Sequence, residues 1–148
     1  MKLDSRPALG VYSEESRTVI QDELVQVRPM ERVRFIAHRG KQILLLDCTN
    51  CPPAELAEVF NECEEVVTSQ PPQSVLTLAD FTGAQFSREV ADRMKVVAVM
   101  DRPHVKRAAI VGAESLPEVY YKALASFSAR EFPSFKTREE AMDWLVQE

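Results

Sequence analysis

The chain has 148 residues, of which 45% are hydrophobic and 28% are charged. This length suits one domain, and the composition is that of an ordinary globular protein, which excludes wholesale disorder. Lys and Arg total 18 against 23 Asp and Glu, so the formal net charge is −5. Non-specific nucleic-acid binding needs a cationic surface, so no nucleic-acid partner is expected.

Membrane insertion and export also lack support in the sequence. The longest apolar run, residues 43–46, is the length of a strand and far short of the ~18 residues of a membrane helix. The first ten residues lack the apolar core of a signal peptide. Three cysteines without an export signal are typical of a reducing compartment. We therefore expect a cytoplasmic protein that is not an integral membrane protein.

Residues 1–31 are expected to form an N-terminal extension that is partly ordered at best. Within it, the apolar residues of segment 17–29 fit one face of a short helix, whereas residues 24–27 fit a strand. Both alternatives stay open. The domain itself is expected to span residues 32–148.

From residue 32 onward, strands and helices alternate. Residues 33–38 are rich in β-branched and aromatic side chains and predict a strand, and Gly40 suits the tight turn that follows. Residues 42–47 predict a second strand, whose unbroken apolar run indicates coverage on both faces. Further strands are predicted over 74–80, 106–112 and 133–135.

Four helices are predicted between and after these strands. Prolines 52 and 53 suit the first turn of the first helix, and Ser87 is expected to cap the second. Ser115 with Glu118, and Thr137 with Glu140, have the spacing of capping boxes for the third and fourth. The order β-β-α-β-α-β-α-β-α predicts an α/β fold: a mostly parallel five-stranded sheet with an N-terminal antiparallel hairpin.

Ligands of open α/β sheets collect at the carboxyl ends of the strands. Three loops leave those ends here, and together they hold the chain's best cluster of small polar and acidic groups. The candidate binding or regulatory residues are Asp47, Asn50, Asp80, Thr82, Ser87 and Glu114. A more ordinary interpretation is that Asp47, Asp80 and Ser115 cap helices and satisfy backbone N–H groups.

Cys48 and Cys51 form a Cys-x-x-Cys motif between a strand and a helix, a position where the helix dipole stabilises a thiolate. This arrangement suits a thiol redox site. Against it, no aromatic residue directly precedes Cys48, no Ile-Pro-Thr-type segment follows downstream, and the later β-α-β-α order is not that of a thioredoxin.

Metal binding and histidine catalysis have weaker support. Cys63 lies on the apolar stripe of the first helix, and His38 and His104 are isolated in the sequence, so neither a metal site nor a cofactor is expected. The basic segment 102–107 could attract an anionic partner, although a solvated loop is the favoured interpretation.

Four stretches of the chain resemble the STAS-like proteins often labelled SpoIIAA-like. These stretches are residues 69–87 (SQPPQSVLTLADFTGAQFS), 101–113 (DRPHVKRAAIVGA), 127–130 (FSAR) and 135–145 (FKTREEAMDWL). The group is compared both with bacterial anti-sigma-factor antagonists and with lipid-transfer domains of the CRAL-TRIO type. The resemblance implies a curved β-sheet with helices packed mainly on one face.

In the anti-sigma antagonists, a Ser or Thr at the start of a helix beyond a core strand is phosphorylated, which changes partner binding. Thr82 is the nearest analogue in this chain and Ser87 the second, but the usual Asp-Ser-Ser-Gly-type motif is absent. Members of the resembled group generally have no assigned enzyme activity.

We therefore expect a non-enzymatic regulatory or binding domain of bacterial type that meets a protein partner through its strand-end loops. The first alternative is a small-molecule or lipid-binding domain with an apolar cleft between sheet and helices. The second is a thiol redox protein that uses Cys48 and Cys51. A homodimer is also expected if one face of the sheet is left uncovered.

Overall fold

A computed structural model describes residues 31–148 of the chain. Our predictions for residues 1–30, namely the loosely ordered extension and the choice between helix and strand over 17–29, lie outside the described residues. Within them, the strands and helices follow the predicted order, and their bounds are as follows. The strands are β1 (Val33–His38), β2 (Lys41–Asp47), β3 (Val75–Asp80), β4 (Val105–Val111) and β5 (Ser134–Phe135), and the helices are α2 (Pro53–Thr68), α3 (Arg88–Asp101), α4 (Glu118–Ser128) and α5 (Arg138–Leu145).

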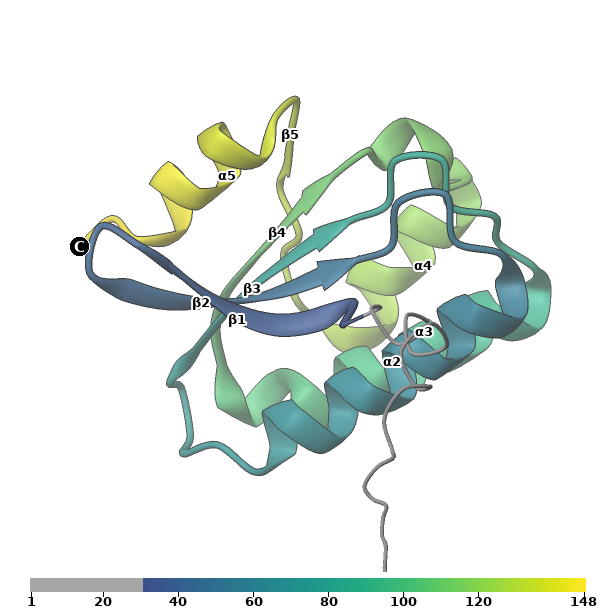
Figure 1. Cartoon of the computed structure of the whole chain (residues 1–148). Helices are drawn as coiled ribbons and strands as arrows, with labels where there is room; N and C mark the ends of the chain where they lie inside the picture. The colour runs from purple at the N-terminus through teal and green to yellow at the C-terminus, as the bar shows by residue number, and fades with distance from the viewer. Residues whose placement is uncertain (1–30) are drawn as a thin grey trace, which may run out of the picture. The chain divides into compact units, whose positions relative to one another are not determined.

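The described strands form one mixed sheet in the order β1-β2-β3-β4-β5 (Figure 1). The hairpin pair β1–β2 is antiparallel and the other pairs are parallel, which confirms the predicted α/β class and the antiparallel hairpin. In the β2–β3 register, Asp47 lies opposite Asp80, so the last residues of these two strands are neighbours.

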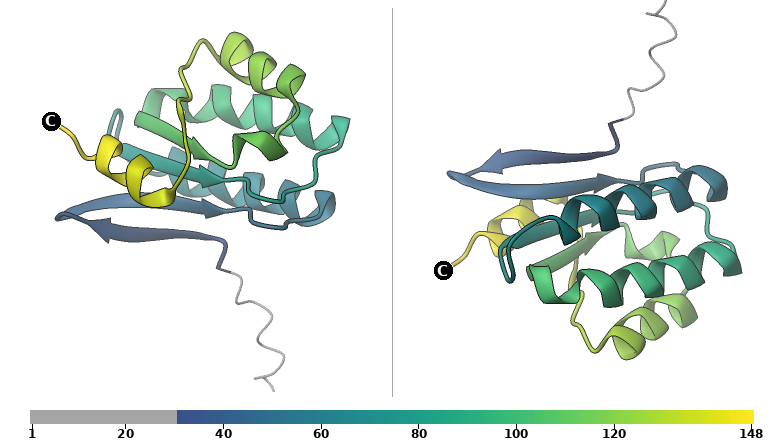
Figure 2. Two further views of the ribbon diagram at one scale, coloured as in Figure 1. Left: turned by 90° about the horizontal axis from the view of Figure 1, so that it is seen from above. Right: turned by 90° about the horizontal axis from the view of Figure 1, so that it is seen from below.

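Both faces of the sheet are covered (Figure 2). Side chains alternate between the faces of a strand, so Leu44 and Leu46 of β2 pack with α2, α3 and α4, whereas Ile43 and Leu45 pack with Ala141 and the rest of α5. Three of the four described helices thus cover one face and α5 covers the other. The continuous apolar run of β2 is explained by this double burial, as the sequence predicted.

The predicted helix caps are correct at two positions and wrong at one. Ser87 accepts a hydrogen bond from the Val90 backbone N–H, and Thr137 accepts one from that of Glu140. Ser115 does not cap α4, which begins at Glu118 after Pro117. Residues 113–115 instead form a 3-10 turn after Gly112, which places Ser115 too early in the chain for the capping box.

Among the described residues, we find no helix with both the length and the apolar character needed to cross a membrane.

Candidate functional site

Strands β2 and β3 end in the same Asp-x-Thr arrangement. The Thr49 hydroxyl donates a hydrogen bond to Asp47 Oδ1 at 2.7 Å, and the Thr82 hydroxyl donates one to Asp80 Oδ1, also at 2.7 Å. Each carboxylate also accepts the backbone N–H of its own threonine. The two aspartates therefore satisfy loop N–H groups, as the more ordinary interpretation expects, although they cap no helix.

Arg138, the first residue of α5, joins the two strand ends. Its Nε donates to Asp80 Oδ2 at 2.7 Å, and its NH2 group lies 3.2 Å from Asp47 Oδ1. Burial alone raises the pKa of Asp47, but the hydrogen bonds from Thr49 and the charges of Arg138 and Arg32 outweigh it, so this pKa lies below its usual range. Arg138 thereby joins the carboxylates of Asp47 and Asp80 across the ends of β2 and β3.

The loops that follow these strands are bonded to one another. The Asn50 N–H donates to the Thr82 carbonyl at 2.8 Å, and the Gly83 N–H donates to the Ser115 hydroxyl at 2.8 Å. Gly112 has a φ of 78°, and a Cβ at this position would overlap the backbone of Thr82. The three loops thus form one tied rim along the carboxyl edge of the sheet.

The predicted site residues have different environments on this rim. Asn50, Thr82 and Glu114 are exposed, Asp47 is half-buried and Asp80 is buried. Ser87 lies further along, where its side chain caps α3. The structure brings Asp47, Asn50, Asp80 and Thr82 together at this edge of the sheet.

Cys48 and Cys51 are both fully buried and carry free thiols. Burial raises the pKa of Cys48 far above its ordinary value and raises that of Cys51 to about 11. A redox nucleophile needs a lowered thiol pKa and access to its substrate, so these environments weigh against the thiol redox alternative.

The two histidines make contacts that stabilise the fold. His38 Nε2 lies 2.8 Å from Asp143 Oδ1 on α5, and His104 Nδ1 lies 2.7 Å from the Gln70 carbonyl. In residues 31–148, no group of three or more His, Cys, Asp or Glu side chains is placed to hold a metal ion.

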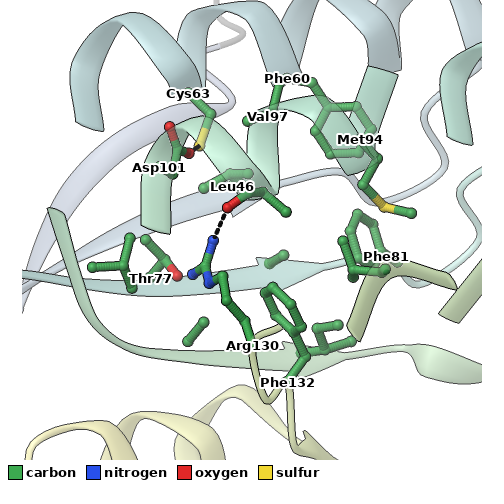
Figure 3. Close-up of a pocket in the computed structure, with 16 residues that line it drawn as sticks. Leu46, Phe60, Cys63, Thr77, Phe81, Met94, Val97, Asp101, Arg130 and Phe132 are labelled. Atoms are coloured by element: carbon green, nitrogen blue, oxygen red, sulfur yellow. Dashed lines mark hydrogen bonds between the residues drawn. The ribbon is translucent and has the colours of Figure 1, made fainter. Parts of the chain in front are cut away.

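A separate cavity of about 60 Å³ lies between the sheet and the helices α2, α3 and α4 (Figure 3). Its walls are mostly apolar, and Leu46, Phe60, Met94 and Val97 are among the residues that form them. The volume of the cavity exceeds what one water molecule requires, but it is smaller than the roughly 150 Å³ of a cavity that binds benzene. The space therefore suits a small group or one end of a larger molecule.

Asp101 lines this cavity at the carboxyl end of α3. The residue is only 4% exposed, and its Oδ1 atom is buried without a hydrogen-bond partner. The Cys63 thiol donates to the other oxygen, Oδ2, at 3.4 Å. Burial raises the pKa of Asp101 to about 6, although the Cys63 hydrogen bond and the Arg130 charge oppose this shift. An unsatisfied buried carboxylate oxygen costs free energy unless a donor reaches it.

Arg130 lines the same cavity from the segment after α4. One guanidinium NH1 donates to the Ala98 carbonyl at 2.9 Å, and the group lies 4.6 Å from the centre of the Phe132 ring. Figure 3 shows Arg130 and Asp101 reaching into the cavity from different walls. The two side chains do not form an ion pair with each other, which leaves unused donors on one wall and an unused acceptor on another.

Sequence reasoning overlooked Asp101, Arg130 and Arg138. Asp101 could have been found, because it continues the buried stripe of Val90, Met94 and Val97 at helical spacing and puts a charge on an apolar face. Arg130 follows a helix end and Arg138 meets Asp80 across 58 positions of the chain, so no local pattern marks either residue.

Comparisons with protein-family models, with curated proteins and with solved structures found no match to this chain. The resemblance to STAS-like proteins therefore stays a prediction.

Proposed function

We propose that this chain is a non-enzymatic binding domain, and that its ligand is a small molecule with an apolar body and an N–H or O–H donor. The donor and the apolar end of the ligand lie in the cavity between the sheet and the helices α2, α3 and α4. The observation that carries the proposal is the unpartnered Oδ1 atom of Asp101, which is buried on the cavity wall.

The cavity has the usual make-up of a small-molecule site. Such sites are mainly apolar and contain a few polar groups that fix the orientation of the ligand. Here the apolar walls come from both layers of the fold, and the polar groups include Asp101, Arg130 and Thr77. A donor placed against Asp101 Oδ1 would replace the hydrogen bonds that this oxygen lost on leaving water.

Binding without catalysis agrees with the chemistry of the surrounding groups. The thiols of Cys48, Cys51 and Cys63 are buried and have raised pKa values, so they are poor nucleophiles at neutral pH. His38 and His104 each engage a ring nitrogen in a contact with another part of the fold.

The test is a two-dimensional NMR titration with a matched pair of uncharged probes. The first is 3-methyl-1-butanol, which has an apolar body and one hydroxyl donor, and the second is its methyl ether, which has no donor. We expect saturable shifts at Met94 and Val97, and at least tenfold weaker binding of the ether. Shifts that never saturate, or equal affinities for the two probes, would contradict the proposal.

Two variants and one control assign the binding to the cavity. Asp101→Leu removes the acceptor and should abolish the preference for the alcohol over the ether. Ala108→Val adds methyl groups to the cavity wall without removing the Asp101 acceptor and should weaken both probes. Asp92→Leu removes an exposed acid of the same helix and should change neither. If Asp101→Leu still prefers the alcohol to the ether as strongly as the wild type does, another residue binds the hydroxyl.

A second candidate function is docking of a protein partner at the rim, and the exposed position of Thr82 favours it. The Thr82 hydroxyl donates a hydrogen bond to one oxygen of Asp80, and the other oxygen of Asp80 accepts one from Arg138. A phosphate on Thr82 would remove the first hydrogen bond and place a second anion close to Arg138, which already pairs with Asp80. Such a change at an exposed tip would alter the surface that a partner meets.

This second candidate is tested by capturing partners from the native host with the wild-type chain, with Thr82→Glu and with Ser126→Glu. Ser126 is an exposed residue of α4 and serves as the charge control. We expect a partner that the wild type and the control retain and that Thr82→Glu loses. The same partners with all three proteins would exclude a phosphate switch at Thr82.

A further inference from the structure

A basic recess lies beside the cavity. It has a volume of about 500 Å³, and its charged lining residues are the cations Arg102, Lys106, Arg107 and Arg130 and the acid Glu131. Val105, Ala108 and Arg130 line both the recess and the cavity. Arg130 therefore lies at the boundary between the apolar cavity and the basic recess.

The charge of the recess is opposite to that of the chain. The whole protein has a net charge of −5, yet four cations and one acid gather here. Lys106 and Arg102 are exposed, and Arg107 is held in place by a hydrogen bond to the Trp144 carbonyl and by its position over the Trp144 ring. Several cations around one hollow attract an anion more strongly than scattered surface charges do.

We infer that the ligand is a short-chain hydroxy acid, whose carboxylate lies at Arg130 and the basic recess while its hydroxyl and apolar end lie in the cavity. This inference rests on the proposed function and adds the charge of the ligand to it. The planar guanidinium of Arg130 has more donors than the one used on Ala98, and this geometry suits a carboxylate. The small volume of the cavity limits the apolar end to a few carbon atoms.

The hydroxyl and the carboxylate complement the two unused groups of the cavity. Asp101 Oδ1 needs a donor and Arg130 needs an acceptor, and the two side chains do not satisfy each other. A ligand that carries a hydroxyl and a carboxylate offers a partner to each of them. A simple fatty acid would leave Asp101 unpartnered, and a simple alcohol would leave the recess empty.

The probes are 2-hydroxy-3-methylbutanoate and the uncharged diol 3-methylbutane-1,2-diol, which share the carbon skeleton and the position of the second hydroxyl. In NMR titrations at pH 7.5, we expect the hydroxy acid to bind at least tenfold more tightly than the diol. We also expect this advantage to shrink as salt is added, because exposed charges of the recess are screened.

Arg130→Gln should remove most of the advantage of the hydroxy acid over the diol, because the carboxylate loses the guanidinium that binds it. Should this variant not fold, the double variant Arg102→Gln/Lys106→Gln changes only exposed cations and should reduce the advantage about threefold. Lys122→Gln, an exposed cation of α4 outside the recess, is the control and should have no effect.

The outcomes separate the two proposals. If the diol binds in the cavity as tightly as the hydroxy acid, the proposed function stands and the inference about the anion is wrong. If neither probe gives saturable shifts at cavity residues, and 3-methyl-1-butanol also gives none, both proposals are overturned. A tenfold advantage that persists in Arg130→Gln and in the recess variant would place the carboxylate elsewhere and contradict the inference.

Discussion

Asp101 and Arg130 carry opposite charges on the walls of one cavity, and no ion pair joins them. Arg130 instead uses a donor on the Ala98 carbonyl, and one oxygen of Asp101 has no partner. Both side chains therefore keep hydrogen-bonding capacity that a polar group of another molecule can use.

The first prediction concerns the pH dependence of stability. Folding raises the pKa of Asp101 from 3.8 to about 6, because burial disfavours the charged carboxylate. Between these values the folded protein holds a proton that the unfolded chain has released, so the free energy of unfolding falls as the pH rises from about 4 to about 6. Above pH 6 the loss is complete and amounts to about 3 kcal/mol.

Asp101→Asn cannot titrate and should lack this contribution. Relative to the wild type, the variant should gain stability progressively between pH 4 and pH 7 in urea denaturation experiments. Asp92→Asn on the exposed side of the same helix is the control. A constant difference between Asp101→Asn and the wild type across this range would show that Asp101 has an ordinary pKa.

The second prediction concerns Arg138. In Arg138→Met, the neighbouring carboxylates of Asp47 and Asp80 lose their shared cation, and Asp80 is only 5% exposed. We expect a loss of about 2–3 kcal/mol in the free energy of unfolding, because a buried charge is left unpaired. Lys122→Met removes an exposed pair with Glu118 and should change stability by only about 0.5 kcal/mol. Equal effects of the two changes would show that the Arg138 bridge does not stabilise the rim.

The third prediction separates backbone strain from steric overlap. Gly40 and Gly112 have nearly the same φ, +81° and +78°, but a Cβ at Gly40 meets no atom within 4 Å whereas one at Gly112 overlaps the Thr82 backbone. Gly40→Ala should cost about 1–2 kcal/mol from the left-handed conformation alone. Gly112→Ala should cost about 2 kcal/mol more, because it must also separate two loops of the rim.

Thermal denaturation of the two alanine variants, followed by circular dichroism, measures this difference. Indistinguishable melting temperatures would mean that the loops containing Gly112 and Thr82 are not in direct contact.

The fourth prediction concerns the thiols. Cys48 and Cys51 are fully buried, and burial raises the pKa of Cys51 to about 11. In the native state at pH 8 we expect both to react with a thiol reagent at least a hundredfold more slowly than in urea. Fast modification of native Cys48 or Cys51, measured by peptide mass mapping, would show that these thiols are accessible and reactive, and would support the thiol redox alternative.

Most of the fold could be predicted because its signals are local. The β-branched residues of β1, the apolar run of β2 and the cap residues Ser87 and Thr137 each act within a few positions of the chain. Ser115 was assigned wrongly as a cap because a left-handed turn at Gly112 shifted the start of α4, and spacing alone does not reveal that turn.

The rim could be predicted in part, and an apolar cleft between sheet and helices could be named only as an alternative, without the residues that line it. Parallel strands end at one edge, so the proximity of Asp47 and Asp80 follows from the topology. The bridge from Arg138 and the convergence of Asp101 with Arg130 depend on how helices separated in the chain pack on the sheet. Periodicity predicts which face of a helix is buried, but it does not predict whether the space behind that face is filled.

The most direct test of the account is a high-resolution crystal structure of the protein grown with 3-methyl-1-butanol. We expect electron density for the alcohol between the sheet and α3, with its hydroxyl oxygen about 2.6–3.0 Å from Asp101 Oδ1. A cavity that is dry or holds only ordered water under conditions that saturate any specific site would contradict it.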